Sequence, residues 1–150
     1  MNVLIGFIIL SAFLQTSFLG VNLVLLIIIA RSFLMENKVN YFLALFSGIL
    51  LGLLSAQNIG FWPIILLVGI KIAHMIRKLP FNISVITFLP VIIICVLIAA
   101  SAELLFLKQT INWTKVILEI VIGIPIFIFI RFWEDKFFIR PSTVKLKIRK

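Results

Sequence analysis

The sequence predicts an all-α integral membrane protein whose helices form one compact bundle. Of the 150 residues, 63% are hydrophobic and 13% are charged, and the mean hydropathy is +1.30. Soluble domains contain about 45–50% apolar residues, so this composition indicates a chain that faces lipid. The connections between the apolar runs are too short to fold as a separate soluble module. We therefore expect one membrane domain.

Counting the apolar runs between polar breaks predicts six membrane spans. A hydrocarbon core about 30 Å thick takes about 20 helical residues. The predicted helices cover residues 1–19, 21–36, 39–55, 60–78, 83–107 and 112–133, which together make a membrane domain over 1–133. Several of these runs are shorter than a straight full span, which predicts tilted helices.

The first three predicted helices end at short polar turns. The first stops at the polar run QTS before Gly20, and the second stops at the ENK turn of residues 36–38. The third stops at SAQNIG, an uncharged segment that suits a tight hairpin turn. Within this helix, Gly48 and Gly52 have the four-residue spacing that lets membrane helices approach closely, and Ser55 extends the small-residue edge.

The last three predicted helices contain proline. Pro63 stands just inside the fourth helix, where its missing N–H costs nothing. Pro90 and Pro125 lie within the fifth and sixth helices, and we expect each to kink its helix. Residues 134–150 are predicted to form a basic cytoplasmic tail that attracts anionic lipids, with a cytoplasmic protein partner as the alternative. The basic residues at its end are Lys145, Lys147, Arg149 and Lys150.

The basic residues predict the orientation in the membrane. Short cytoplasmic loops carry the excess of lysine and arginine. With six spans and both termini in the cytoplasm, every lysine and arginine except Lys108 and Lys115 falls on the cytoplasmic side. The net charge of +9 is thus accounted for by membrane orientation, and no nucleic-acid partner is expected.

The sequence contains no pattern that indicates catalysis. A metal site is not expected from one histidine, one cysteine and unclustered carboxylates, and neither is any other cofactor. The lone aspartate, Asp135, falls in the predicted tail, which makes a Ser-His-Asp triad implausible. We therefore predict that the protein is not an enzyme.

Two acidic residues and one basic group are the remaining candidates for binding. Glu103 and Glu119 lie within apolar helices, so they either pair with Lys108 and Lys115 near the outer surface or contact a partner or ligand. A second group lies at helical spacing near the cytoplasmic end of the fourth helix. It is expected to snorkel toward lipid headgroups, with an acidic cytoplasmic partner as the alternative. Its members are Lys71, His74 and Lys78.

The run NLVLLIIIARSFLMENKVNYFLALFSGILLGLLSAQNIGFWPIILLVGIKI resembles the core of the rod shape-determining protein MreD family. The matching positions are Gln15 in LQTSFLG, Asn22, the turn at 36–38, Gly48, Ser55 and Gly60. The family commonly has an aspartate where this chain has Gly52, and a proline where it has Val21. The substitution of glycine for the acid favours helix packing at that position.

The resemblance implies a non-catalytic scaffold of the bacterial cell-elongation machinery in the inner (cytoplasmic) membrane. Such proteins act with the bitopic protein MreC, and through it with the MreB filament and the peptidoglycan polymerase and transpeptidase. The family fold is similar to the substrate-binding subunit of energy-coupling-factor transporters, so a vitamin-transporter subunit is the alternative. A holin ranks third, since holins usually have fewer spans. Assembly into a homo-oligomer is left open.

Overall fold

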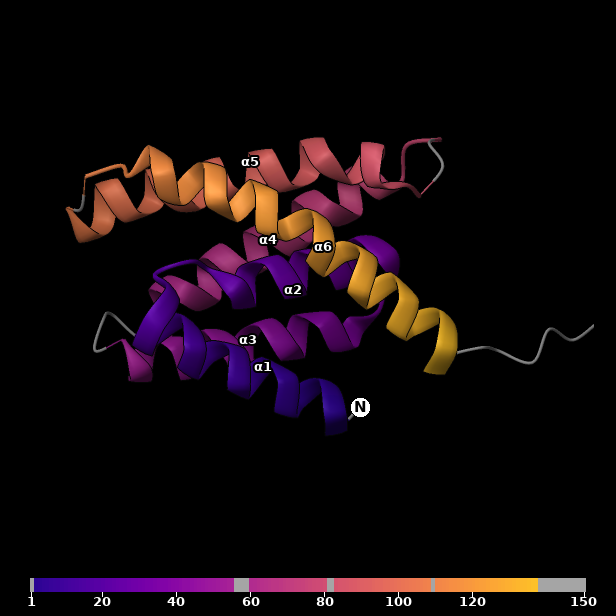
Figure 1. The fold of residues 1–150 in the computed structure, drawn as a ribbon, viewed down its shortest axis with the longest axis horizontal. Coiled ribbons are helices and arrows are strands. Elements are labelled where there is room, and N and C mark those ends of the chain that lie inside the picture. The colour runs from indigo at the N-terminus through magenta and orange to yellow at the C-terminus, as the bar shows by residue number, and fades with distance from the viewer. Residues whose placement is uncertain (1, 56–59, 81–82, 109, 138–150) are drawn as a thin grey trace, which may run out of the picture.

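The computed structural model describes residues 2–55, 60–80, 83–108 and 110–137. These residues form an all-helical bundle without strands, which confirms the predicted all-α class (Figure 1). The α-helices are α1 (Asn2–Leu14), α2 (Leu23–Leu34), α3 (Lys38–Leu54), α4 (Phe61–Arg77), α5 (Val85–Leu107) and α6 (Trp113–Phe137). A π-helical turn, η1 (Gln15–Leu19), continues α1.

The predicted helices are confirmed with small shifts at their ends, except at the last one. α6 continues to Phe137, so residues 134–137 belong to a helix and the predicted boundary at 133 is wrong. The basic residues Lys145, Lys147, Arg149 and Lys150 lie outside the described residues, as do residues 56–59 of SAQNIG. α5 and α6 run without interruption through Pro90 and Pro125.

Local side-chain chemistry explains where the helices begin and end. The Asn37 side chain accepts a hydrogen bond from the Val39 N–H and starts α3. Ser84 and Thr87 form a reciprocal capping box that starts α5. Gly20 follows η1 with a φ of +57°, a left-handed conformation that glycine adopts without steric cost.

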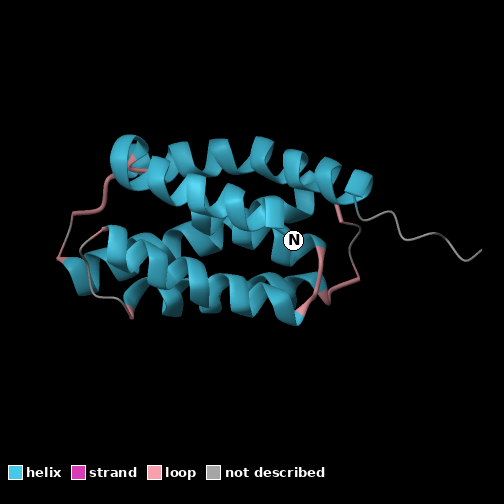
Figure 2. Cartoon of the chain, turned by 90° about the horizontal axis from the view of Figure 1, so that it is seen from below, coloured by secondary structure: helices cyan, strands magenta, loops and turns pink. Residues whose placement is uncertain are grey.

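Consecutive helices run antiparallel, so the connections gather at the two ends of the bundle (Figure 2). The described N-terminus and the end of α6 lie at the same end (Figure 1). An even number of antiparallel helices accounts for this arrangement of the two ends.

α2 is the central helix of the bundle. It contacts all five other α-helices, and its residues from Val24 to Phe33 are all buried. Around it pack apolar side chains of the other helices, including a stacked pair of rings, Phe88 and Phe127, with centroids 4.3 Å apart. With only 12 residues and no exposed face, α2 is held by its neighbours.

α3 and α4 form a closely packed hairpin. A Cβ placed on Gly48 would lie 2.5 Å from the backbone nitrogen and 2.6 Å from the Cα of Pro63. There is room only for glycine at this position. The helices approach closely at Gly48, the kind of contact for which the four-residue spacing of Gly48 and Gly52 is suited. Gly52 is buried on the same helix, and the Ser55 hydroxyl donates to the Leu51 carbonyl at 2.6 Å.

Within the part of the chain that the structure describes, two helices are long and apolar enough to cross a membrane, judged by length and composition: Val85–Leu107 and Trp113–Glu134. Shorter apolar helices are Leu4–Ser17, Leu23–Leu34 and Lys38–Leu54.

Candidate functional site

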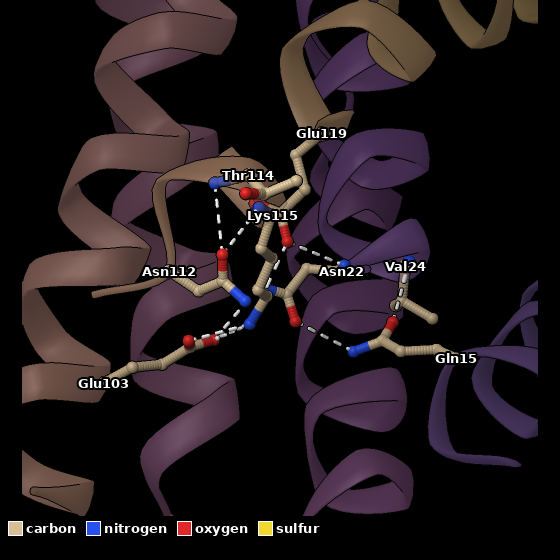
Figure 3. Close-up of polar contacts among 8 residues, drawn as sticks. All are labelled: Gln15, Asn22, Val24, Glu103, Asn112, Thr114, Lys115 and Glu119. Atoms are coloured by element: carbon tan, nitrogen blue, oxygen red, sulfur yellow. Dashed lines mark hydrogen bonds and ion pairs between the residues drawn. The ribbon is translucent and has the colours of Figure 1, made fainter. Parts of the chain in front are cut away.

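A buried polar cluster lies at the end of the bundle where α2 and α6 begin (Figure 3). We call it the Asn22 cluster. Four of its residues are at most 9% exposed, within a bundle whose core is otherwise mostly apolar. Its members are Gln15, Asn22, Glu103, Lys115 and Glu119.

Asn22 is the centre of this cluster. Its Oδ1 accepts a hydrogen bond from Gln15 Nε2 at 3.1 Å, and its Nδ2 donates to Glu103 Oε1 at 3.0 Å. Its backbone N–H donates to Glu119 Oε1 at 2.9 Å. Gln15 Oε1 also accepts from the Val24 N–H at 3.2 Å, so two amide groups at the start of α2 are satisfied. The Glu119 carboxylate also interacts favourably with the positive, N-terminal end of the α2 dipole.

Glu103 and Lys115 form the ion pair of the cluster. Lys115 Nζ lies 2.9 Å from Glu103 Oε1 and 2.7 Å from Oε2, and 4.0 Å from Glu119 Oε1. Lys115 thus pairs with the acids of the cluster, whereas Lys108 is exposed at the end of α5. Asn112 caps the first turn of α6, its Oδ1 accepting from the Thr114 and Lys115 N–H groups.

A polar pocket of about 250 Å³ opens beside the cluster. Its lining includes Asn22, Glu103, Lys115 and Glu119 together with the α5–α6 connection. The two carboxylates and one ammonium give this pocket the means to hold a small polar group or a polar side chain of another protein. Among the described residues, no group of three or more histidine, cysteine or acidic side chains could hold a metal ion.

A second buried polar group lies at the opposite end of α2. Arg31 donates from Nε to Glu134 Oε1 at 3.1 Å and from a terminal nitrogen to Asn40 Oδ1 at 2.8 Å. Asn40 Nδ2 in turn donates to the Met35 carbonyl at 2.6 Å. We call Arg31, Asn40 and Glu134 the Arg31 cluster. α6 therefore supplies an acid to both ends of α2, Glu119 at one and Glu134 at the other.

No sequence pattern groups these three residues, because each has an ordinary local explanation. Arg31 counts as a cytoplasmic charge, and Glu134 falls in the predicted tail. The signal that could have indicated this cluster is Asn40, a side-chain amide in the first turn of a mostly apolar helix.

His74 does not belong with Lys71 and Lys78 as predicted. Both lysines are exposed, but His74 is only 4% exposed and its ring meets Tyr41. The Tyr41 hydroxyl lies 3.2 Å from His74 Nδ1. His74 packs against Tyr41 of the adjoining helix α3, and because it is buried there it does not extend toward lipid headgroups with the lysines.

The residues that carry the MreD resemblance fall into two groups. Gln15 and Asn22 join the Asn22 cluster, whereas Gly48, Gly52 and Ser55 belong to the α3–α4 packing edge. Gly60 precedes α4, and a Cβ added there would meet no atom within 4 Å.

Replacing Asn22 with alanine is expected to lower the free energy of unfolding by about 1–3 kcal/mol, because Gln15 and Glu103 lose a buried partner. Unfolding in mixed detergent micelles measures the change. Ser101→Ala on the exposed side of α5 is the control, with an expected effect near zero. Equal stability of the two variants would contradict a structural role for Asn22.

Comparison with known proteins gives no match: no protein-family model, no curated protein and no solved structure is similar to this chain.

Proposed function

We propose that the chain is a multi-pass protein of the bacterial cytoplasmic membrane with six spans and both termini in the cytoplasm. The supporting observation is an apolar exterior around an apolar core. Large apolar side chains are exposed on every α-helix except the central α2. Soluble monomers rarely expose continuous apolar surface on this scale, whereas a bilayer requires it. Examples are Leu10 (57%), Phe42 (65%), Ile64 (63%), Ile86 (80%) and Ile117 (62%).

The short helices fit this placement. The 17 residues of α3 or α4 extend about 25 Å, whereas the hydrocarbon core is about 30 Å thick. A modest local thinning of the bilayer, or polar side chains at the helix ends that reach the headgroups, would accommodate the difference. α2 extends only about 18 Å, but it is enclosed by protein and need not match the lipid.

Within this membrane protein, we propose a scaffold role of the MreD type in cell elongation. One observation carries the proposal: Gln15 and Asn22, the polar positions of the resemblance, hydrogen-bond to each other in the Asn22 cluster. Gly48 is accounted for separately by its close approach to Pro63. An MreC-like bitopic protein is the proposed partner, which would connect the chain to MreB and to the peptidoglycan polymerase and transpeptidase.

Affinity purification from the native membrane tests the scaffold. The expected result is recovery of a coiled-coil bitopic protein, together with rounding of rod-shaped cells when the chain is depleted. Recovery of an ATPase-bearing energising module instead, with unchanged cell shape, would contradict the scaffold.

A vitamin-transporter subunit is the second candidate, and the polar pocket beside the Asn22 cluster favours it. Its volume of about 250 Å³ suits a small molecule, and it adjoins Glu103, Lys115 and Glu119. Purified protein that retains a small molecule, and that associates with an ATPase module, would establish this function in place of the scaffold.

Substituting Glu119 with glutamine distinguishes a functional acid from a purely structural one. Glutamine retains an oxygen that can accept from the Asn22 N–H, so the fold is expected to persist while the charge is lost. The expected result is reduced recovery of the partner and shorter, rounder cells. Glu36→Gln at an exposed turn is the matched control. Normal assembly and normal cell shape with the Glu119 variant would show that this acid is not a partner contact.

A further inference from the structure

An apolar groove lies between the end of α4 and the start of α5, and Phe33 of α2 also lines it. Its volume is about 480 Å³. On its walls, Leu79, Ile83 and Ile86 are 48%, 38% and 80% exposed, so the groove opens on the outer surface of the bundle. In the proposed membrane placement, this surface faces lipid. The groove therefore offers an apolar seat for an acyl chain.

Arg77 is the one charged residue among the described residues that line this groove. It is the last residue of α4, and it is half-buried. None of the described acids forms an ion pair with it, whereas Arg31 is paired with Glu134. Its Nη1 has no hydrogen-bond partner among the described residues. The described part of the bundle thus leaves the Arg77 charge uncompensated beside an open apolar groove.

The surroundings of Arg77 favour an anion. The next residue, Lys78, is exposed and adds a second positive charge. The first turn of α5 contributes Ile86 and Thr87 to the same groove, and the N-terminal end of a helix carries a partial positive charge. Arginine binds phosphate well because its planar guanidinium can donate two parallel hydrogen bonds. A phosphate group is therefore the anion that suits this position.

The groove lies at the depth of lipid headgroups. α5 (Val85–Leu107) is long and apolar enough to cross a membrane, and it begins at the end of the bundle where α6 finishes (Figure 1). The start of a spanning helix lies near the boundary between headgroups and hydrocarbon. The groove extends along α5 as far as Pro90, on the second turn. Arg77 thus stands at the level of the phosphates, and the apolar walls continue toward the acyl chains.

We propose that this groove binds an anionic phospholipid of the phosphatidylglycerol type. The Arg77 guanidinium donates to the lipid phosphate, Lys78 adds attraction from the surface, and one acyl chain lies against Ile86 and Pro90. A choline headgroup would bring its own positive charge to a groove that no described acid lines, whereas glycerol adds no charge. The proposal rests on the membrane placement above and is independent of the scaffold role.

Native mass spectrometry of the purified full chain tests this site. The protein is equilibrated in micelles with equal amounts of phosphatidylglycerol and phosphatidylcholine of identical acyl chains. The wild type is expected to retain phosphatidylglycerol about fivefold over phosphatidylcholine, the ratio for one basic residue that acts on one net lipid charge. Equal retention would overturn the site and leave the membrane placement standing, whereas retention of neither lipid would contradict both. Displacement of the lipid by inorganic phosphate would also overturn a lipid site.

Two variants locate the binding. Arg77→Gln removes the charge, and Ile86→Trp fills the groove while every charge is kept. The first is expected to bring the ratio of the two lipids close to one, and the second to release the bound lipid.

Two matched variants are the controls. Lys38→Gln removes an exposed cation at the start of α3, and Leu105→Trp enlarges a residue that is 73% exposed near the other end of α5. Both are expected to keep the wild-type ratio. If Arg77→Gln keeps that ratio, or if Lys38→Gln lowers it equally, the preference comes from general surface charge and the groove is not the site. Unchanged lipid retention by Ile86→Trp would likewise contradict a chain in the groove.

Discussion

Replacing Arg31 with methionine is expected to lower the free energy of unfolding by about 3–5 kcal/mol, the cost of leaving a buried charge without its partner. The Arg31 and Glu134 side chains are 8% and 9% exposed, so solvent does little to compensate either charge. The variant also removes the donor to Asn40, which holds the turn between α2 and α3 through the Met35 carbonyl. Equilibrium unfolding in mixed detergent micelles measures the loss.

The double variant Arg31→Met with Glu134→Leu separates the charge from the packing. With both charges removed, the buried penalty disappears, and most of the lost stability is expected to return. Lys38→Met is the control, because Lys38 is exposed at the start of the neighbouring helix and is expected to change stability little. A single Arg31 variant as stable as the Lys38 variant would contradict the assigned role of the Arg31 cluster.

Gly48→Ala is expected to destabilise the protein by about 2–3 kcal/mol through overpacking. The added Cβ would meet the Pro63 backbone, which cannot rotate away as a flexible side chain would. The hairpin of α3 and α4 would have to separate by a fraction of an ångström along its length. The same unfolding measurement reports the effect.

Gly6→Ala is the matched control for this substitution. Gly6 also lies within a helix, but a Cβ there meets no atom within 4 Å. The control gains the helix propensity of alanine, up to about 1 kcal/mol, without the clash. The two variants are therefore expected to change stability in opposite directions. A stabilising effect of Gly48→Ala would show that α3 and α4 are not in close contact at Gly48.

The helices could be predicted from sequence because their signals are local. Polar turns at 36–38 and 77–80 interrupt apolar runs, and these breaks separate the helices. The end of α6 was predicted too early, since the charges at 134–136 imply water. In the structure, Glu134 is paired with an arginine from α2, and α6 continues to Phe137.

The polar clusters could be predicted only in part. Glu103 and Glu119 stood out as acids in apolar helices, and Lys115 lay near both. Arg31 belongs to a buried cluster because it pairs with Glu134, which is 103 residues away in the sequence. Local sequence patterns do not predict a contact between residues so far apart. The grouping of His74 with Lys71 and Lys78 was wrong for the same reason, because the residue that contacts His74, Tyr41, comes from another helix.

Cysteine accessibility in intact cells tests the six-span placement most directly. In a Cys95→Ala background, single cysteines replace Glu36 and Leu79 at the proposed cytoplasmic turns, and Gln57 and Thr110 at the proposed outer turns. A membrane-impermeant maleimide is expected to label positions 57 and 110 in spheroplasts, and positions 36 and 79 only after the membrane is permeabilised. Labelling of positions 36 and 57 from the same side would show that α3 does not cross the membrane and would contradict the six-span bundle.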